Sequence, residues 1–239
     1  MPSERFYLAA SYTQGMEVEI LGQEQHHLSH VMRVAIGETI ELVDGQGALA
    51  EALVLRHEKR ISLLKIVNVA HFPPPQCLLE LVIPMLRASK LELIVEKATE
   101  LGADAFHFYP ADLAEKTDIS QNAQERLRLL SISALKQSGR LYLPKFSFAS
   151  HLEHLLQLPM QVQKLFGDLD PTAPSLFSGL LSLPLPEQIL FITGPEKGFS
   201  TKERQRLSAQ AHCVRLNANI LRAETAPITA TALIKGVLV

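Results

Sequence analysis

The periodicity of hydrophobic and polar positions changes after residue 72. In the first part, apolar and polar residues alternate over short runs, which is typical of half-buried β-strands. The turn Asp44-Gly45-Gln46-Gly47 predicts a hairpin, because glycine accepts the positive φ angles that such turns need. Short strands with frequent turns favour a small barrel. We expect strands at 17–20, 39–43, 49–55 and 61–69, and a short helix at 27–32.

Three consecutive prolines in His71–Gln76 indicate a linker, because proline cannot continue a helix or a central strand. We therefore expect two domains, at 1–72 and 73–239. In the second, buried apolar runs alternate with stripes at helical spacing, which predicts a parallel sheet covered on both faces. The expected strands are 78–83, 105–109, 164–166, 189–192 and 214–216. The expected helices are 91–101, stopped by Gly102, then 127–138, 201–211 and 225 to the C-terminus, with Thr225 as N-cap.

The composition is that of an ordinary globular protein: 239 residues, 47% hydrophobic and 20% charged. No apolar run approaches the roughly 18 residues of a membrane span, and the first residues lack the apolar core of a secretory signal. Cys77 and Cys213 offer neither a disulfide framework nor metal-ligand spacing, so we expect a reducing, cytoplasmic setting. The net charge is −2, so a nucleic-acid partner would have to meet local basic patches.

Two unusual polar loops follow predicted strands near the C-terminus. In Thr193–Phe199, the glycines let the backbone approach a ligand closely, although a plain turn between strand and helix would look the same. In Leu216–Thr225, the apolar pair Ile220-Leu221 interrupts a polar loop and suggests contact with an apolar ligand surface such as adenine. The alternative is a capping segment for the following helix. Loops at the carboxyl ends of neighbouring strands can hold a ligand between them.

Other charged segments allow both a structural and a functional interpretation. The spacing His26-His27-x-x-His30 suggests zinc, but no fourth ligand follows nearby, so we expect no metal. Arg87 and Lys90 begin a predicted helix, where they are candidate phosphate contacts or part of a solvated face. Arg140 follows a helix end, where a cation suits the helix dipole or could contact RNA.

Five segments carry a family resemblance: His26–Arg33 with Asp44-Gly45, Lys97–Gly102, Gln137–Arg140, Gly194–Phe199 and Leu221–Ala226. Together they resemble the RsmE family of SPOUT methyltransferases, which methylates N3 of a uridine in 16S ribosomal RNA. The resemblance covers nearly the whole chain. It implies an α/β protein with an N-terminal PUA-like β-barrel that binds RNA and a C-terminal SPOUT parallel-sheet domain with a deep trefoil knot. It also implies a homodimer, the cofactor S-adenosyl-L-methionine (AdoMet) and the small ribosomal subunit as partner.

The residue chemistry and the resemblance together suggest roles for individual residues. Arg222 is expected to stabilise the uridinate or anchor its phosphate, and Glu224 or Glu196 to accept the proton. The candidate RNA contacts are Arg5, Arg33, Arg87, Lys90 and Arg140. The expected AdoMet-binding residues are Thr193, Gly194, Pro195, Glu196, Gly198, Leu216, Ile220, Leu221, Arg222, Ala223, Thr225 and Ala226.

Three departures from the family pattern keep alternatives open. Lys197 stands where the family usually has glycine, and a positive φ there would cost roughly 1 kcal/mol. The loop 216–220 lacks a common glycine, and Ala111–Lys116 lacks a usual arginine. The alternatives are a SPOUT enzyme with another target, such as ribose or guanine in tRNA or rRNA, and a non-catalytic RNA-binding relative.

Overall fold

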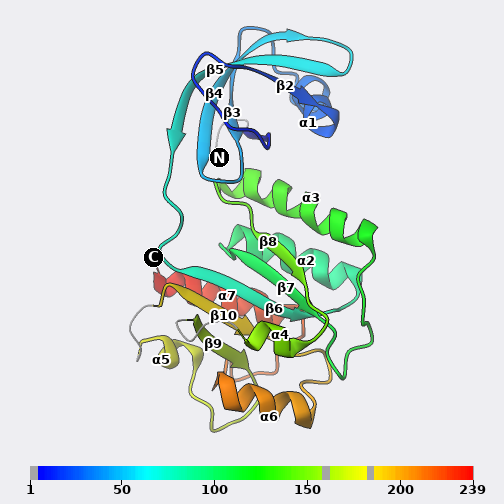
Figure 1. Cartoon of the computed structure of the whole chain (residues 1–239), viewed down its shortest axis with the longest axis vertical. Coiled ribbons are helices and arrows are strands. Elements are labelled where there is room, and N and C mark those ends of the chain that lie inside the picture. The colour runs from blue at the N-terminus through cyan, green and yellow to red at the C-terminus, as the bar shows by residue number, and fades with distance from the viewer. Residues whose placement is uncertain (1–4, 158–161, 182–185, 239) are drawn as a thin grey trace. The chain divides into compact units, whose positions relative to one another are not determined.

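The computed structural model describes residues 5–157, 162–181 and 186–238 (Figure 1). The chain divides into two compact units, one made of Met1–Pro74 with Ile132–Leu143, the other of Pro75–Ser131 with Pro144–Val239. The proline segment between them contains neither helix nor strand. No helix within the described ranges has the length and apolar character that crossing a bilayer requires.

The first unit contains a five-stranded sheet in the order β1-β3-β4-β5-β2, which curls around its own hydrophobic core. The four predicted strands are confirmed. The three-residue β1 was missed, because so short a segment shows no alternation. The strands are β1 (Arg5–Tyr7), β2 (Glu17–Leu21), β3 (Thr39–Val43), β4 (Ala48–His57) and β5 (Ile61–His71).

The predicted hairpin turn joins β3 and β4. Gly45 and Gly47 adopt φ angles of 75° and 101°, which favour glycine. The Asp44 carboxylate accepts hydrogen bonds from the backbone N–H groups of Gln46 and Ala48 at 2.7 and 3.0 Å. The turn chemistry expected from the sequence is therefore confirmed.

The short helix of the first unit begins earlier than predicted and is irregular. It consists of α1 (Gly22–His26) followed by a single π-helical turn, η1 (His27–Val31). Leu28 is buried, whereas Val31 and Met32 are exposed, so only part of the predicted apolar stripe contributes to the core.

The second unit contains a six-stranded sheet in the order β11-β9-β10-β6-β7-β8, and all its strand pairs are parallel. The parallel sheet is confirmed. The prediction missed the edge strand β8 and placed the last strand two residues too late, because Arg215 forms only an isolated bridge. The strands are β6 (Leu78–Pro84), β7 (Ala105–Tyr109), β8 (Lys145–Phe148), β9 (Val162–Gly167), β10 (Gln188–Ile192) and β11 (His212–Val214).

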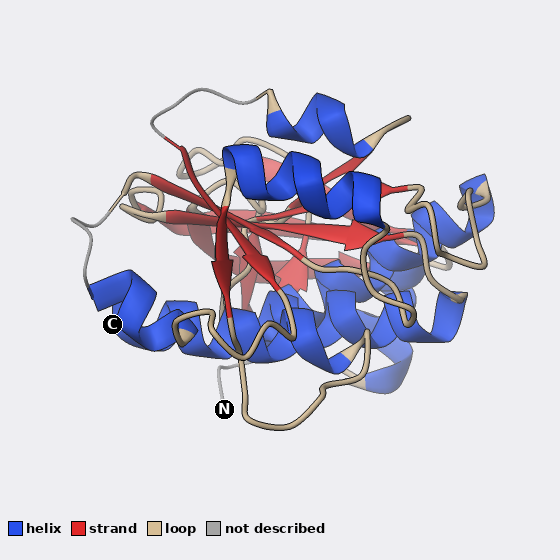
Figure 2. Ribbon diagram, turned by 90° about the horizontal axis from the view of Figure 1, so that it is seen from below, coloured by secondary structure: helices blue, strands red, loops and turns tan. Residues whose placement is uncertain are grey.

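Helices cover both faces of this sheet (Figure 2). One face packs against residues of α2, α3, α5 and α7, and the other against residues of α4 and α6. The short helices α4 and α5 were not predicted. Gly102, with φ of 105°, follows the end of α2 as expected. The helices are α2 (Ala88–Glu100), α3 (Gln121–Ser138), α4 (Leu152–Leu156), α5 (Leu176–Leu181), α6 (Thr201–Gln210) and α7 (Thr225–Leu238).

The strand register brings three loops together. Ile192 at the end of β10 pairs with Phe166 of β9 and with Val82 of β6, and Val214 of β11 pairs with Gly167. The loops that follow β9, β10 and β11 therefore leave the sheet at the same edge, which is where open α/β sheets bind ligands.

Candidate functional site

A cavity of about 610 Å³ lies among these three loops and the first turn of α2. Its volume falls within the range of small-molecule sites in proteins. Its lining combines backbone, apolar side chains and charged groups. The lining residues are Lys90, Gly167–Leu169, Thr193–Phe199, Arg204, Arg215–Asn217, Asn219–Ala223 and Ala226.

The loop after β10 is tied to the sheet and closed by a tight turn. The Thr193 N–H donates to Val82 O, and the Gly198 N–H donates to Pro195 O, both at 2.9 Å. Gly198 adopts φ of 74°, and a Cβ there would meet no atom within 4 Å. The residue that requires glycine is therefore Gly198 and not Lys197, because Arg33 is the single non-glycine residue of the described chain with positive φ.

The loop after β11 turns sharply into α7. The Arg222 carbonyl accepts hydrogen bonds from the N–H groups of Thr225 and Ala226 at 2.9 and 3.0 Å. Helix α7 starts at Thr225 itself, so the predicted N-cap is one position late. Ile220 is 78% exposed and lies on the cavity with Leu221. The apolar pair is thus available to a ligand, as the sequence suggested.

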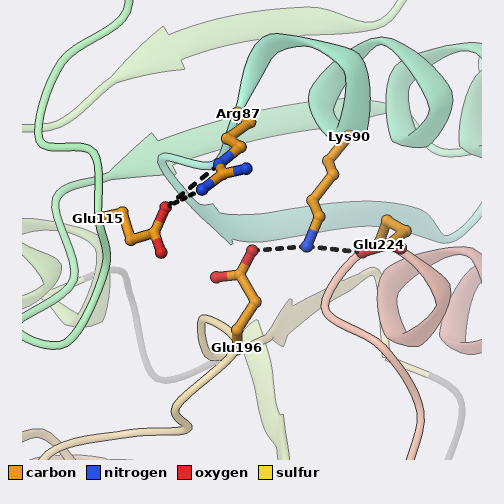
Figure 3. Close-up of polar contacts among 5 residues, drawn as sticks. All are labelled: Arg87, Lys90, Glu115, Glu196 and Glu224. Carbon is orange, nitrogen blue, oxygen red and sulfur yellow. Dashed lines mark hydrogen bonds and ion pairs between the residues drawn. The ribbon is translucent and has the colours of Figure 1, made fainter.

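Lys90 connects both loops to α2 (Figure 3). Its ammonium group donates a hydrogen bond to Glu196 Oε1 at 2.6 Å and lies 3.2 Å from Glu224 Oε2. That second contact is an ion pair without regular hydrogen-bond geometry, since Glu224 Oε2 is buried and accepts no hydrogen bond. Side-chain exposure is 27% for Lys90, 43% for Glu196 and 13% for Glu224. We call these three residues the lysine cluster.

The contacts in the lysine cluster shift the pKa values of Lys90 and Glu196 toward their charged forms. The hydrogen bond to Glu196 raises the pKa of Lys90, and the contacts with Glu224 add to this, although burial opposes it. Burial by itself would raise the pKa of Glu196, but the hydrogen bond from Lys90, a backbone hydrogen bond and the charges of Lys90 and Arg87 lower it overall. At neutral pH the cluster therefore consists of one cation and at least one firmly ionised carboxylate.

A second polar cluster, which the sequence analysis missed, borders the same cavity. Asp168 follows β9, and its side chain is only 6% exposed. Its Oδ1 accepts hydrogen bonds from the N–H groups of Leu169 and Asp170 and from Arg204 at 2.6, 3.2 and 2.5 Å. Within the described chain, Asp168 Oδ2 accepts none. Arg215 also lines the cavity, and we call Asp168, Arg204 and Arg215 the aspartate cluster.

A sequence signal for the aspartate cluster existed but was ambiguous. Asp168 is a polar residue at the end of a buried strand, a position that often faces a ligand. The start of α6 carried a clearer signal, because Ser200 and Glu203 form a capping box. Glu203 also accepts a hydrogen bond from the Asp112 N–H at 3.0 Å, which attaches the segment after β7 to α6.

The structure brings most of the expected site residues to one place. Of the twelve expected AdoMet-binding residues, all but Thr225 line the cavity, and so does Lys90. Arg222 is exposed, and its side chain contacts no polar partner among the described residues. Glu224 forms an ion pair with Lys90 and is not part of the lining.

The remaining RNA candidates lie in varied surroundings. Arg87 is exposed and pairs with Glu115 at 2.7 Å, a contact that raises the pKa of Arg87. The Arg5 side chain is only 9% exposed and pairs with Glu41 at 2.8 Å, which leaves it little surface for RNA. Arg33 is exposed, and Arg140 is half-buried just beyond the end of α3.

Among the described residues, no group of His, Cys, Asp or Glu is arranged to hold a metal ion. The rings of His26 and His30 stack with their centroids 4.9 Å apart. The histidine spacing thus produces a ring contact along one helix face.

Comparison with known proteins defines the class of protein. The family model described as an RNA methyltransferase domain matches residues 73–235, and the RNA methyltransferase PUA domain matches residues 20–67. The first match covers more than half of the chain, and both agree with a parallel-sheet domain that follows a curled N-terminal sheet.

Similar individual proteins identify the family within this class of RNA methyltransferases. Ribosomal RNA small subunit methyltransferase E from Bacillus subtilis is 32% identical and covers 90% of this chain and 88% of its own length. The protein of the same name from Synechocystis is 32% identical, covering 92% of this chain and 73% of its own. The crystal structure of that methyltransferase from Neisseria gonorrhoeae, bound to S-adenosyl methionine, is 26% identical with a TM-score of 0.86 and covers 98% of both chains. The chain belongs to the ribosomal RNA small subunit methyltransferase E family.

Proposed function

We propose that this protein transfers the methyl group of AdoMet to N3 of a uridine in the 16S RNA of the small ribosomal subunit. One observation carries the proposal: the two loops that resemble the cofactor loops of the family form the walls of one cavity. Family membership supports the same activity, because the relatives are named as small-subunit rRNA methyltransferases.

The residues present fit AdoMet. Gly194 allows tight loop packing, since a Cβ there would lie 3.4 Å from the Phe199 ring. Exposed Leu169 and Ile220 offer apolar surface for a planar base. Asp168 Oδ2 can accept a hydrogen bond from a hydroxyl or amino group, both of which AdoMet carries. The Lys197 position is free of strain, which removes one reason for expecting a non-catalytic relative.

The chemistry places a clear demand on the protein. When bound, AdoMet supplies a methyl group activated by its sulfonium. Uridine N3 carries a proton at neutral pH, so the protein has to promote loss of this proton and stabilise the negative charge that spreads onto O2 and O4. Arg222 lies on the cavity with an unpaired guanidinium group and suits this role or phosphate anchoring. We propose Glu196 or Glu224 as proton acceptor, although pairing with Lys90 makes Glu196 a weaker base than an isolated carboxylate.

Several features of the family complete the proposal. The N-terminal domain, 1–72, would bind RNA, with Arg33 as an exposed contact, and Arg5, Arg87 and Arg140 remain further candidates. The C-terminal domain, 73–239, would carry the SPOUT trefoil knot and form a homodimer. The absence of a disulfide between Cys77 and Cys213 is compatible with the reducing cytoplasm that we propose as its location.

The decisive experiment is incubation with isotope-labelled AdoMet and small-subunit rRNA or assembled subunits, followed by nucleoside mass analysis. We expect label in N3-methyluridine. Label in a ribose-methylated nucleoside or in methylguanosine would indicate another target. A thermal-shift titration with AdoMet tests the alternative of a non-catalytic RNA-binding relative. A protein without an AdoMet site shows no rise in its unfolding temperature at millimolar AdoMet.

A further inference from the structure

Lys90 has a hydrogen-bonding capacity that its two carboxylate partners do not use up. An ammonium group has three N–H donors. One is directed at Glu196 and a second lies toward Glu224, and Lys90 has no other polar partner in the described chain. Lys90 also lines the cavity, so its remaining donor is available to a molecule bound there.

Lys90 differs from the other cations on the cavity in how firmly it is held. Arg222 and Lys197 are exposed, and an exposed flexible side chain loses conformational entropy when it fixes a ligand. Arg204 already donates to Asp168. The Lys90 side chain, by contrast, is held between carboxylates of two loops (Figure 3). Preorganised donors of this kind stabilise developing charge most effectively, because they need no reorganisation during the reaction.

We propose that Lys90 donates its third hydrogen bond to a carbonyl oxygen of the target uracil and stabilises the negative charge left when N3 loses its proton. Glu196 and Glu224 hold the ammonium group in place, a positioning role that each has in addition to the proton acceptance proposed for one of them. This inference rests on the proposed function and replaces the phosphate contact that the sequence suggested for Lys90.

The electrostatic surroundings agree with this role. The raised pKa of Lys90 keeps it charged at neutral pH, so it serves as a donor and not as the base. Without Lys90, the carboxylate of Glu196, which lines the same cavity, would remain near the reacting base. Its charge would disfavour a uridinate, so loss of Lys90 removes a stabilising charge and leaves a repelling one unpaired.

The test compares Lys90→Met and Lys90→Arg with the control Lys97→Met. Lys97 lies on the same helix and pairs with two carboxylates, Glu96 and Glu100, at 2.8 and 2.9 Å, but does not line the cavity. Calorimetry gives the Kd for AdoMet, thermal unfolding reports folding, and turnover is measured on small-subunit rRNA. Turnover is measured again on rRNA transcribed with 5-fluorouridine, whose N3 proton is more acidic.

We expect Lys90→Met to lower kcat about 100-fold or more on ordinary rRNA, as removal of a preorganised donor does in other enzymes. The Kd for AdoMet should stay within about threefold of the wild-type value, a difference below 1 kcal/mol. The defect should shrink on 5-fluorouridine rRNA, because a more acidic base needs less stabilisation. Lys90→Arg should recover part of the activity, since its planar guanidinium keeps the charge but not the geometry. Lys97→Met should behave as the wild type.

Two results would overturn the inference. An equal kcat defect on both RNAs, or a loss of AdoMet affinity that matches the loss of turnover, would make Lys90 a structural tether of the loops. If Lys90→Met fails to fold, Lys90→Gln provides the same comparison with a polar side chain. A wild-type protein that neither binds AdoMet nor methylates uridine would instead refute the proposed function.

Discussion

The lysine cluster and the aspartate cluster border the same cavity with opposite charge patterns. Lys90 faces two carboxylates, whereas Asp168 pairs with Arg204, and a second arginine, Arg215, lines the same cavity. In each cluster, ion pairs or hydrogen bonds occupy part of the central residue's bonding capacity and fix its position. The capacity that remains is a donor in Lys90 and an acceptor in Asp168.

This difference explains how one cavity can bind both a target base and a cofactor. A fixed donor suits a base that becomes negatively charged, and a fixed acceptor suits the hydroxyl and amino groups of a cofactor. We therefore expect changes in the lysine cluster to affect turnover and changes in the aspartate cluster to affect AdoMet affinity.

Arg222 provides the strongest challenge to this division, because it lines the cavity but belongs to neither cluster. If it stabilises the uridinate or its phosphate, Arg222→Ala should lower kcat about 100- to 1000-fold, the effect of removing one charge-stabilising donor. The Kd for AdoMet, measured by calorimetry, should barely change. Equal losses of binding and turnover would move Arg222 into the cofactor site.

The aspartate cluster is tested by Asp168→Asn, which keeps the size of the side chain but replaces a carboxylate oxygen by an amide group. We expect the affinity for AdoMet to fall about tenfold, equivalent to about 1.4 kcal/mol, with little change in kcat at saturating cofactor. Asp170→Asn is the matched control, since Asp170 bonds to Thr172 and does not line the cavity. Unchanged AdoMet affinity in Asp168→Asn would remove the cofactor role of this cluster.

A smaller effect should show that the loop after β10 requires glycine at position 198. Gly198→Ala places a side chain at φ of 74° and should lower the free energy of unfolding by about 1 kcal/mol. Chemical denaturation measures this directly. Gly236→Ala, in helix α7 and without a close neighbour, should instead raise stability by roughly 0.5 to 1 kcal/mol. Equal effects of the two substitutions would contradict the requirement for glycine in the loop.

The smallest expected effect is the pH dependence of the stability that the Glu196 ion pair contributes. The pKa of Glu196 in the folded protein lies below its ordinary value of 4.5, so its ion pair stabilises the fold above that pH and the contribution is lost as pH falls through the folded pKa. Solvent screening keeps the contribution modest, since Glu196 is 43% exposed. The difference in unfolding free energy between wild type and Glu196→Gln should therefore shrink below about pH 4.5. A difference that stays constant to lower pH would show that Lys90 does not stabilise the ionised form.

Local patterns of hydrophobic residues and turn residues predicted much of the architecture. Alternation predicted the strands of the N-terminal sheet, and Asp44-Gly45 predicted its hairpin, because both depend on backbone geometry within a few residues. Buried apolar runs alternating with helical stripes predicted the parallel sheet. Short edge elements such as β8 were missed, since four residues contain too little periodicity to distinguish a strand from a loop.

The sequence by itself also identified the two loops that line the cavity, because glycine, proline and an isolated apolar pair are local signals. Only the tertiary structure decided that Lys90 meets Glu196, a residue 106 positions away, and that Asp168 borders the same cavity. Strand order and register place these side chains together, and neither is encoded in the residues beside them. The partners of a charge are set by the packing of the whole sheet, whereas the shape of a turn is set by its own residues.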